Sequence, residues 1–245
     1  MDYATKNTLK WVKSLYQNKY RTINSCFNIE GEKMIQEALY HHPERIKYIF
    51  HLDPDLIENK IPKSCKLFKI KKQDLLRISN MKSPHKCIAV VDFISFPSSS
   101  NGLVIACDNI QDPGNFGTII RTADWFNVKT IWASKDTVDK YNSKVIQSSM
   151  GSIFRINIEY LDLDEKLKNT EKRIYGTTLT GKTLTKKMKL DKESVIVMGN
   201  EGNGISKKIL SHVDEELLIF GKGFAESLNV GVATGILLAF FTSID

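Results

Sequence analysis

The loop at residues 108–117 (DNIQDPGNFG) is the first of three polar loops whose residue types could do chemistry. Its glycines allow the backbone to approach a ligand closely. Asn115 can cap a helix that follows, and Arg121 stands six residues later, in the second turn of that helix. The pattern fits a ligand-binding loop, and it also fits a capped helix with a surface arginine.

The second loop, residues 198–206 (MGNEGNGIS), contains three glycines and two asparagines, which indicates backbone with positive φ. Glycine-rich loops often hold phosphate, but this one lacks the G-K-[ST] of a P-loop and the G-x-G-x-x-G of a dinucleotide-binding turn. An NAD-dependent dehydrogenase is therefore disfavoured. Glu201, the one acidic residue of the loop, suits an amine or a hydroxyl better than a phosphate.

The third loop, residues 221–230 (GKGFAESLNV), runs directly into the apolar segment Leu228–Phe241. That segment is too short for a membrane span, which takes about 20 residues, and it predicts a buried helix. Ser227 and Asn229 stand at its start. Helix capping accounts for one polar residue there but not for both.

The elements around these loops predict an α/β domain. Apolar strand patterns precede the loops at residues 103–107, 195–198 and 217–220, with further strands at 129–133 and 173–177. Helical patterns occupy 117–126, 144–149 and 228–241. Strands that alternate with helices imply a parallel sheet covered on both faces. Ligands of such sheets bind beyond the carboxyl ends of the strands, where these loops begin.

The N-terminal part predicts a separate small α/β domain. We expect helices at 7–17, 32–40 and 73–78, and strands at 46–51, 66–70 and 87–94. The Pro- and Ser-rich stretch 97–101 reads as a linker between a domain at 1–96 and one at 102–245. Residues 1–100 hold 17 basic and 10 acidic side chains, whereas the remainder holds 18 of each. A localised basic excess suggests a polyanion partner, although a solvated basic surface would look the same.

Other features narrow the class of protein. The four cysteines are widely spaced with no C-x-x-C pair, so we expect no metal site and reduced thiols in a cytoplasmic protein. The first residues show no signal peptide, and no apolar run is long enough to suggest a membrane partner.

The three loops resemble the three motifs of the SpoU (TrmH-like) class of the SPOUT methyltransferase superfamily. The first motif, N-x-x-D-P-x-N-x-G-x-x-x-R-x-A-x-x-F, stands at residues 109–126; the G-N-E-G-x-G-I motif stands at 199–205; and the E-S-L-N-V motif stands at 226–230. The likeness extends to residues 27–31 and 88–91, at the two ends of the small RNA-binding domain found in many members. Many members have serine where this chain has Gly231.

The resemblance implies an RNA methyltransferase that transfers a methyl group from S-adenosylmethionine to a ribose 2′-hydroxyl. It implies a deep trefoil knot in the C-terminal domain and a homodimer in which Arg121 of one subunit lies near the cofactor of the other. The residues it assigns to cofactor binding are Gly199, Asn200, Glu201, Gly202, Ile219 and Leu228. The residues it assigns to catalysis are Asn115, Arg121, Glu201, Ser227 and Asn229.

The role of Arg121 follows from its chemistry within this family. A guanidinium keeps its proton in proteins, so it is an awkward general base. We expect Arg121 to bind a phosphate and to stabilise the negative charge that develops on oxygen. Glu201 would orient Arg121 or Asn115.

The substrate we expect is structured RNA, with ribosomal RNA first and transfer RNA second. The basic domain lacks an aromatic stacking motif, which favours recognition of RNA shape and backbone. Two alternatives stay open at this point: a non-catalytic RNA-binding protein with the same fold, and a base methyltransferase of the same superfamily. The E-S-L-N-V motif favours ribose chemistry over base chemistry.

Overall fold

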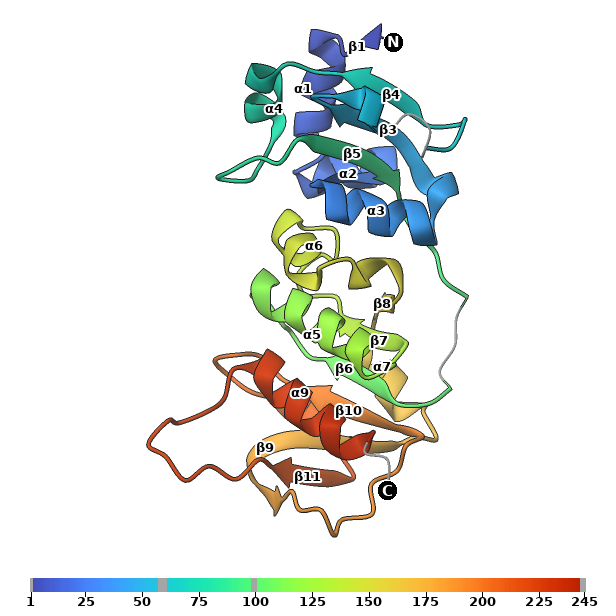
Figure 1. Ribbon diagram of the computed structural model, residues 1–245. Helices are drawn as coiled ribbons and strands as arrows, with labels where there is room; N and C mark the ends of the chain where they lie inside the picture. The colour runs from blue at the N-terminus through green and yellow to red at the C-terminus, as the bar shows by residue number, and fades with distance from the viewer. Residues whose placement is uncertain (1, 57–60, 98–100, 243–245) are drawn as a thin grey trace. The chain divides into compact units, whose positions relative to one another are not determined.

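The computed structural model describes residues 2–56, 61–97 and 101–242. The chain divides into two compact units (Figure 1). The first contains Met1–Ser95 together with Tyr141–Ile146, and the second contains Phe96–Lys140 together with Gln147–Asp245. Residues 98–100 of the predicted linker lie outside the described residues.

The first unit is a five-stranded mixed sheet with helices. Its strands are β1 (Asp2–Tyr3), β2 (Cys26–Glu30), β3 (Ile46–His51), β4 (Lys66–Lys69) and β5 (Cys87–Asp92), in the order β1-β4-β3-β5-β2. Its helices are α1 (Lys6–Ser14), α2 (Asn18–Asn24), α3 (Glu32–His41) and α4 (Lys72–Ile78). Short 3₁₀ turns lie at Pro43–Arg45 and Pro54–Leu56. Strand β4 is parallel to β1 and β3, whereas β5 is antiparallel to β2 and β3.

Two clusters hold the first unit together. Apolar residues of α1 and α4, among them Val12 and Leu75, pack against Phe50 and Val90 of the sheet. The segment Tyr141–Ile146 joins this unit although it lies far along the chain. The ring of Tyr141 stacks on Phe27 at 4.2 Å between centroids, and its hydroxyl accepts a hydrogen bond from the backbone N–H of Ile94.

The second unit is a six-stranded parallel sheet. Its strands are β6 (Val104–Cys107), β7 (Thr130–Ser134), β8 (Asn157–Leu161), β9 (Arg173–Thr183), β10 (Ser194–Met198) and β11 (Glu215–Leu218), in the order β11-β9-β10-β6-β7-β8. Its helices are α5 (Pro113–Trp125), α7 (Leu163–Lys168), α8 (Lys207–Leu210) and α9 (Val230–Phe241), and a 3₁₀ turn covers Ser152–Phe154. Helix α6 (Ser143–Ser149) spans the change from one unit to the other.

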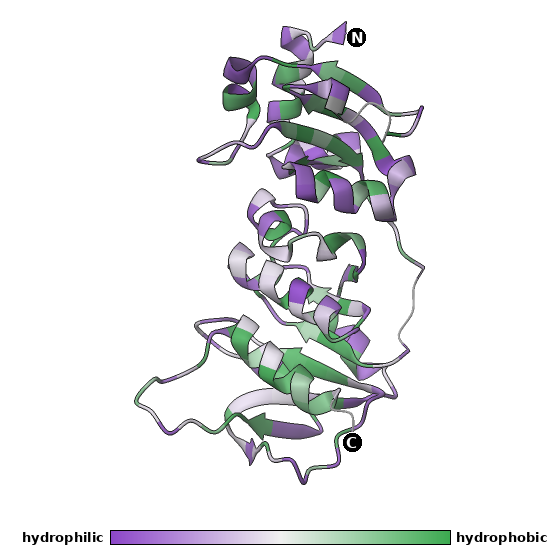
Figure 2. Cartoon of the chain, in the orientation of Figure 1, coloured by the Kyte–Doolittle hydropathy of each residue, from purple (hydrophilic) through white to green (hydrophobic). Residues whose placement is uncertain are grey.

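Helices cover both faces of the parallel sheet, as expected. Side chains alternate between the faces of a strand, so Ile174 and Tyr175 of β9 point to opposite sides. Ile174 packs in the cluster that contains α7 and α8. Tyr175 makes an edge-to-face contact with Phe241 of α9, at 5.0 Å between ring centroids. The central strands and α9 are accordingly the most apolar part of this unit (Figure 2).

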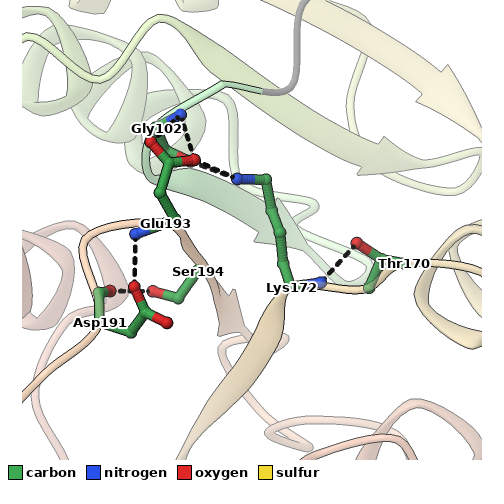
Figure 3. A network of polar contacts seen from close by, with 6 residues as sticks. All are labelled: Gly102, Thr170, Lys172, Asp191, Glu193 and Ser194. Atoms are coloured by element: carbon green, nitrogen blue, oxygen red, sulfur yellow. Dashed lines mark hydrogen bonds and ion pairs between the residues drawn. The ribbon is translucent and has the colours of Figure 1, made fainter.

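A polar network ties together the amino ends of three parallel strands (Figure 3). The Glu193 carboxylate accepts hydrogen bonds from the backbone N–H of Gly102, at 2.8 and 2.9 Å, and from Lys172 Nζ at 2.8 Å. Lys172 Nζ also donates to the Gly102 carbonyl at 2.8 Å. The Lys172 ammonium, followed by the Gly102 N–H, lowers the pKa of Glu193. This network fixes the starts of β6, β9 and β10 at the sheet edge opposite the three motif loops.

Most predicted elements are present, but several of their ends were wrong, among them those of α1, which ends at Ser14 instead of 17, and of β9, which runs to Thr183 instead of 177. Helix α5 begins at Pro113 rather than near residue 117, because Asp112 caps it. Strand β11 ends at Leu218, two residues earlier than predicted, and α9 begins at Val230 rather than 228. The sequence patterns also missed β1, β2, α2, β8, α7 and α8.

No helix within the described ranges is both long and apolar enough to cross a bilayer. The four cysteines are buried and unpaired.

Candidate active site

The order of strands places the first two motif loops together. Along the chain, β6, β7 and β8 are added one after another towards one edge of the sheet. The chain then crosses to the other side of β6, where it forms β9 and then β10, and β10 pairs with β6. Neighbouring strands β6 and β10 therefore form a switch point, where open α/β sheets bind ligands. Asn200 Nδ2 donates to the Asn109 carbonyl at 2.8 Å, and the backbone N–H of Ser206 donates to Asp108 Oδ2 at 2.7 Å. These contacts fix the two loops to each other.

The second loop is a tight turn that requires glycine. Asn200 and Gly204 exchange two backbone hydrogen bonds, each 2.9 Å long. A Cβ added to Gly199 would lie 2.2 Å from the Gly204 carbonyl carbon, so no larger residue fits there. Gly204 has φ +68°, which confirms the positive φ expected for the loop at that position. The Asn200 side chain closes the turn by accepting from the N–H of Gly202.

Asn115, Glu201 and Asn229 meet through their side chains and join all three loops. Asn115 Nδ2 donates to Glu201 Oε1 at 3.0 Å, and Asn229 Nδ2 donates to Asn115 Oδ1 at 2.7 Å. Glu201 Oε1 also lies 3.4 Å from the backbone N–H of Asp112. We call these three side chains the Asn115 hub. Of the two partners expected for Glu201, the structure shows Asn115.

The first motif positions Asn115 differently from the sequence prediction. Asp112 is the N-cap of α5, and its Oδ1 accepts from the backbone N–H of Asn115 at 2.8 Å. Asn115 therefore lies in the first turn and does not cap the helix, which corrects the expected capping role. Since its backbone is satisfied by Asp112, its side chain is left for Glu201 and Asn229.

Asn229 both caps the last helix and contacts the first motif. Its Oδ1 caps α9 by accepting from the backbone N–H of Gly231 at 2.9 Å and of Val232 at 3.3 Å. Its Nδ2 is directed to Asn115. One amide therefore starts the last helix and links it to the first motif.

Arg121 and Ser227 are not hydrogen-bonded to the hub. Arg121 lies in the third turn of α5, one turn later than expected, because the helix begins earlier. Its side chain is exposed and forms no hydrogen bond or ion pair with any residue that the structure describes. Ser227 is likewise exposed and makes no hydrogen bond within those ranges. The structure thus unites three of the five predicted catalytic residues.

The third loop presents an open backbone and exposed apolar side chains. All of residues 221–229 are exposed, and Ile219, one of the predicted cofactor residues, is half-buried. Phe224 is fully exposed, and Leu228 is 48% exposed. A Cβ at Gly221 or Gly223 would meet no atom within 4 Å, so the chain is unobstructed on these sides.

Strand β9 contributes a feature that the sequence patterns missed. In the pairing with β11, Gly176 lies opposite Glu216 and Lys182 lies opposite the next residue, Leu217. Residues 177–181 of β9 therefore have no pairing partner in β11 and form a bulge. Thr178 Oγ1 donates to Glu216 Oε2 at 2.7 Å, and Leu179 is 71% exposed. The sequence pattern predicted this strand only to residue 177, so its extension to Thr183 and the bulge are both seen only in the pairing with β11.

The residues present fit S-adenosylmethionine. Glycine-rich turns offer backbone N–H and C=O groups without side-chain obstruction, which suits a purine edge. Leu228 of the third loop is an exposed apolar side chain, which suits contact with a purine ring, and Glu201 of the second loop carries a carboxylate, which suits a cationic ligand. Within the described ranges, no group of three or more His, Cys, Asp or Glu residues could hold a metal ion.

Cys107 is not a nucleophile candidate, although it ends β6 beside the loops. Burial, and then the charges of Asp108 and Glu201, raise the pKa of its thiol far above the ordinary range. The thiol stays protonated and unreactive.

Comparison with known proteins identifies the family. Residues 102–239 match the model of the SpoU rRNA methylase family, and residues 6–89 match the MRM3-like substrate binding domain. The chain belongs to the SpoU rRNA methylase family. The family recognised from the three motifs is therefore confirmed, together with its α/β fold, its RNA methyltransferase activity and its S-adenosylmethionine cofactor.

Relatives in the family match along nearly the whole chain. The 23S rRNA (guanosine(2553)-2′-O)-methyltransferase RlmP of Bacillus subtilis is 30% identical over 241 residues, which cover 97% of each protein. A solved RNA methyltransferase of the TrmH family from Porphyromonas gingivalis is 31% identical, with a TM-score of 0.87 over 97% of this chain and 98% of that one. The AdoMet-bound rRNA methyltransferase of Sinorhizobium meliloti shares the fold at 24% identity, with a TM-score of 0.86 over 98% of this chain and 96% of that one.

Proposed function

We propose that this protein transfers a methyl group from S-adenosylmethionine to a ribose 2′-hydroxyl of ribosomal RNA. The Asn115 hub is the observation that carries the proposal. It joins the loops after β6 and β10 to the start of α9, so the three family motifs form one polar centre. The five polar residues expected for catalysis are all retained, which argues against a non-catalytic RNA-binding protein.

The residues of the hub have different tasks in this proposal. Glu201 holds the Asn115 amide with its carbonyl oxygen directed to Asn229. Asn115, Asn229 and Ser227 would position the ribose against the cofactor. When bound, S-adenosylmethionine supplies an electrophilic methyl group on a sulfonium.

Arg121 would act on the charge of the RNA. A 2′-hydroxyl loses its proton during the reaction, and negative charge develops on the oxygen. Arg121 would stabilise that oxygen and bind a neighbouring phosphate through its forked N–H groups. Because lysine cannot form the fork, Arg121→Lys should lose most of the activity.

The protein would act as a homodimer. Arg121 is exposed and lacks a partner among the described residues, so it is free to complete the site of a second subunit. Trp125, one turn further along α5, is 85% exposed, and Val232 of α9 is 51% exposed. Helices α5 and α9 pack together, and exposed apolar side chains on both suit a subunit interface. A deep trefoil knot is proposed from the family fold.

Ribosomal RNA is the preferred substrate. The Bacillus subtilis relative, which matches over both units, is named for 23S rRNA. A relative named for tRNA guanosine 18, from Aquifex aeolicus, matches only 56% of this chain. Transfer RNA is therefore the second candidate. A cytoplasmic location is proposed from the four unpaired cysteines.

The test uses tritiated S-adenosylmethionine and total RNA from a strain that lacks the gene. Alkali cannot cleave next to a 2′-O-methylated ribose, so the product should be labelled alkali-resistant dinucleotides from ribosomal RNA. Arg121→Ala should abolish this label. Label in alkali-sensitive mononucleotides would instead show base methylation, and label from transfer RNA alone would move the substrate to the second candidate.

A further inference from the structure

The basic excess of the first unit is concentrated on one pair of helices. Helices α1 and α4, with Lys71 at the N-cap of α4, carry six basic side chains and one acidic side chain, Asp74. The segment from α3 to the following turn, residues 32–45, carries two basic and three acidic side chains. The two helices and Lys71 thus account for +5 of the net +7 of residues 1–100, and the remaining basic side chains include Lys63, Lys66 and Lys69 in and before β4.

The basic residues of α1 form a stripe. Lys6, Lys10 and Lys13 recur at intervals of four and three residues, which places them along one side of the helix. All three are exposed, whereas Val12 and Leu15 are buried in the core. The stripe therefore faces solvent while the opposite side of the helix packs on the sheet.

Helix α4 extends the stripe laterally. Helices α1 and α4 contact each other, and Lys13 Nζ donates to the Ser79 carbonyl directly after α4, at 3.0 Å. Lys71, Lys72 and Arg77 are exposed, and Lys82 follows in the next loop. We define Lys6, Lys10, Lys13, Lys71, Lys72 and Arg77 as the α1–α4 face.

Most charges of this face have no ion-pair partner among the residues that the structure describes; Arg77 is the exception. Arg77 lies 3.6 Å from Asp74, and Lys13 bonds to Ser79 and to Asn80. Lys6, Lys10, Lys71 and Lys72 form no ion pair with any described residue. On the other segment, Arg45 is likewise paired with Glu44 at 3.6 Å.

We propose that the α1–α4 face is the surface on which the phosphate backbone of the RNA substrate docks. The inference rests on the proposed function and assigns the RNA contact to two helices within the substrate binding domain. Flexible ammonium groups without fixed partners bind phosphate as point charges, which suits shape and backbone recognition of folded RNA. Binding at this face releases counterions and must weaken as salt rises.

The test is RNA binding by two matched variants of the full-length protein. The first replaces Lys6, Lys10 and Lys72 with Gln, and leaves Lys13 because it has structural bonds. The control replaces Lys19, Lys33 and Lys66 with Gln, which removes the same charge from exposed positions elsewhere in the unit. Fluorescence anisotropy with a fluorescein-labelled RNA hairpin, repeated over a range of salt concentrations, reports the dissociation constant and its salt dependence.

If each of the three lysines neutralises one phosphate, the first variant should bind about 10- to 100-fold more weakly near physiological salt. The slope of log affinity against log salt should become shallower by about 2 to 3. The control should change the dissociation constant by no more than about 3-fold and the slope by less than about 1, since general loss of positive charge acts only weakly at a distance. Equal losses in both variants, or no loss in the first, would overturn the proposal.

Methylation is measured separately, so the two proposals can fail independently. In the labelling assay the first variant should show a raised KM at unchanged kcat, because docking precedes chemistry. If the wild type binds RNA through this face but methylates none, the docking surface stands and the reaction is wrong. If methylation occurs and both variants bind equally, the reaction stands and the docking surface is wrong.

Discussion

At the scale of single residues, the directions of the hydrogen bonds show how Asn115 is held between Glu201 and Asn229. Asn115 is held because it donates to a carboxylate on one side and accepts from an amide on the other. A side chain with both a donor and an acceptor is needed, which is the chemistry of Asn and Gln. Asn115 at its position in the first turn of α5 therefore orients the hub, and Glu201 and Asn229 each require it.

Exchange of the two polar groups tests this pairing. Asn115→Asp puts a carboxylate against the Glu201 carboxylate, and we expect methylation to fall at least about 10-fold, as a coupling of 1–3 kcal/mol implies. Adding Glu201→Gln places an amide N–H at position 201, which can donate to the new carboxylate at position 115. The double variant should recover part of the loss, measured as kcat/KM in the tritium assay.

The single variant Glu201→Gln completes the comparison with Asn115→Asp and the double variant, and serves as its control. Losses that simply multiply in the double variant would show that Glu201 acts on the substrate and not through Asn115. The cofactor affinity of all three variants, measured by calorimetry, separates a disturbed cofactor loop from a disturbed ribose contact.

His51 makes folding of the first unit sensitive to acid. The ring is fully buried, Nδ1 accepts from the backbone N–H of Asp53 at 2.9 Å, and Nε2 lies 3.9 Å from Glu32. Burial lowers its pKa, despite the opposing effects of the Asp53 contact and the Glu32 charge. The unfolded chain therefore binds the proton more readily than the folded one.

The contribution of neutral His51 to the free energy of unfolding should be fully present above about pH 6.5. It should be lost as the pH falls from there towards the lowered pKa of the folded state. His51→Asn keeps an acceptor for Asp53 but cannot titrate. Its urea midpoint should fall less between pH 7.5 and 5.5 than that of the wild type. His85→Asn, at an exposed position, should keep the wild-type difference; equal acid loss in His51→Asn would contradict the prediction.

At the scale of elements, the contact between α5 and α9 connects the first motif to the third. Gly231 of α9 lies against Thr118 of α5, and a Cβ at that glycine would stand 2.8 Å from Thr118 Cγ2. The far end of α5 is fixed by Arg155, which contacts Asp124 at 2.7 Å. The hub depends on this helix pair being held at a close, fixed distance.

Two glycines on α9 should respond in opposite ways to alanine. Gly231→Ala overpacks the contact and should destabilise the protein by about 1–3 kcal/mol. Gly235→Ala, where the Cβ would lie 3.7 Å from Thr122 Cγ2, meets only ordinary contact and should stabilise the helix by up to about 1 kcal/mol. Thermal unfolding measures both, and Thr118→Ser should relieve the first loss by removing the methyl group.

The sequence predicted elements better than it predicted their ends. Long apolar patterns located β6, β10 and α9, because burial on both faces leaves few polar residues. The start of α5 was missed because Asp112 and Asn115 are both able to cap, and only the observed bond to the Asn115 N–H decides between them. The bulge of β9 depends on pairing with β11, which no local pattern encodes.

The candidate site shows the same limit. Motif order located the three loops, and parallel strands bring them to one edge. That Glu201 reaches Asn115 and not Arg121 depends on the turn closed by Asn200, a tertiary contact. The sequence identified the right residues but not which of them touch.

At the scale of the whole molecule, the exposed position of Arg121 is consistent with the homodimer proposed above. The hub in one chain has no cation from α5 to act on a phosphate, while Arg121 is exposed and without a described partner. If the active site joins the hub of one subunit to Arg121 of another, each dimer contains two composite sites. Inactivating changes on different subunits then affect different sites.

Heterodimers of two inactive variants test this arrangement. Arg121→Ala and Glu201→Ala are co-expressed with different tags and purified in tandem, so that each dimer holds one subunit of each kind. One site then combines both defects, and the other combines the intact Arg121 with the intact Glu201. We expect about half of the wild-type methylation per dimer, against almost none for either homodimer.

The outcome decides how the subunits cooperate. Activity near that of the parental homodimers would show that Arg121 serves the hub of its own chain, since both subunits of the heterodimer would then remain defective. Sedimentation of the wild type as a monomer would contradict the composite site directly, because no second hub would be present. A control heterodimer of wild type and Arg121→Ala should also keep about half the activity in either arrangement, which verifies that the mixed dimers are folded.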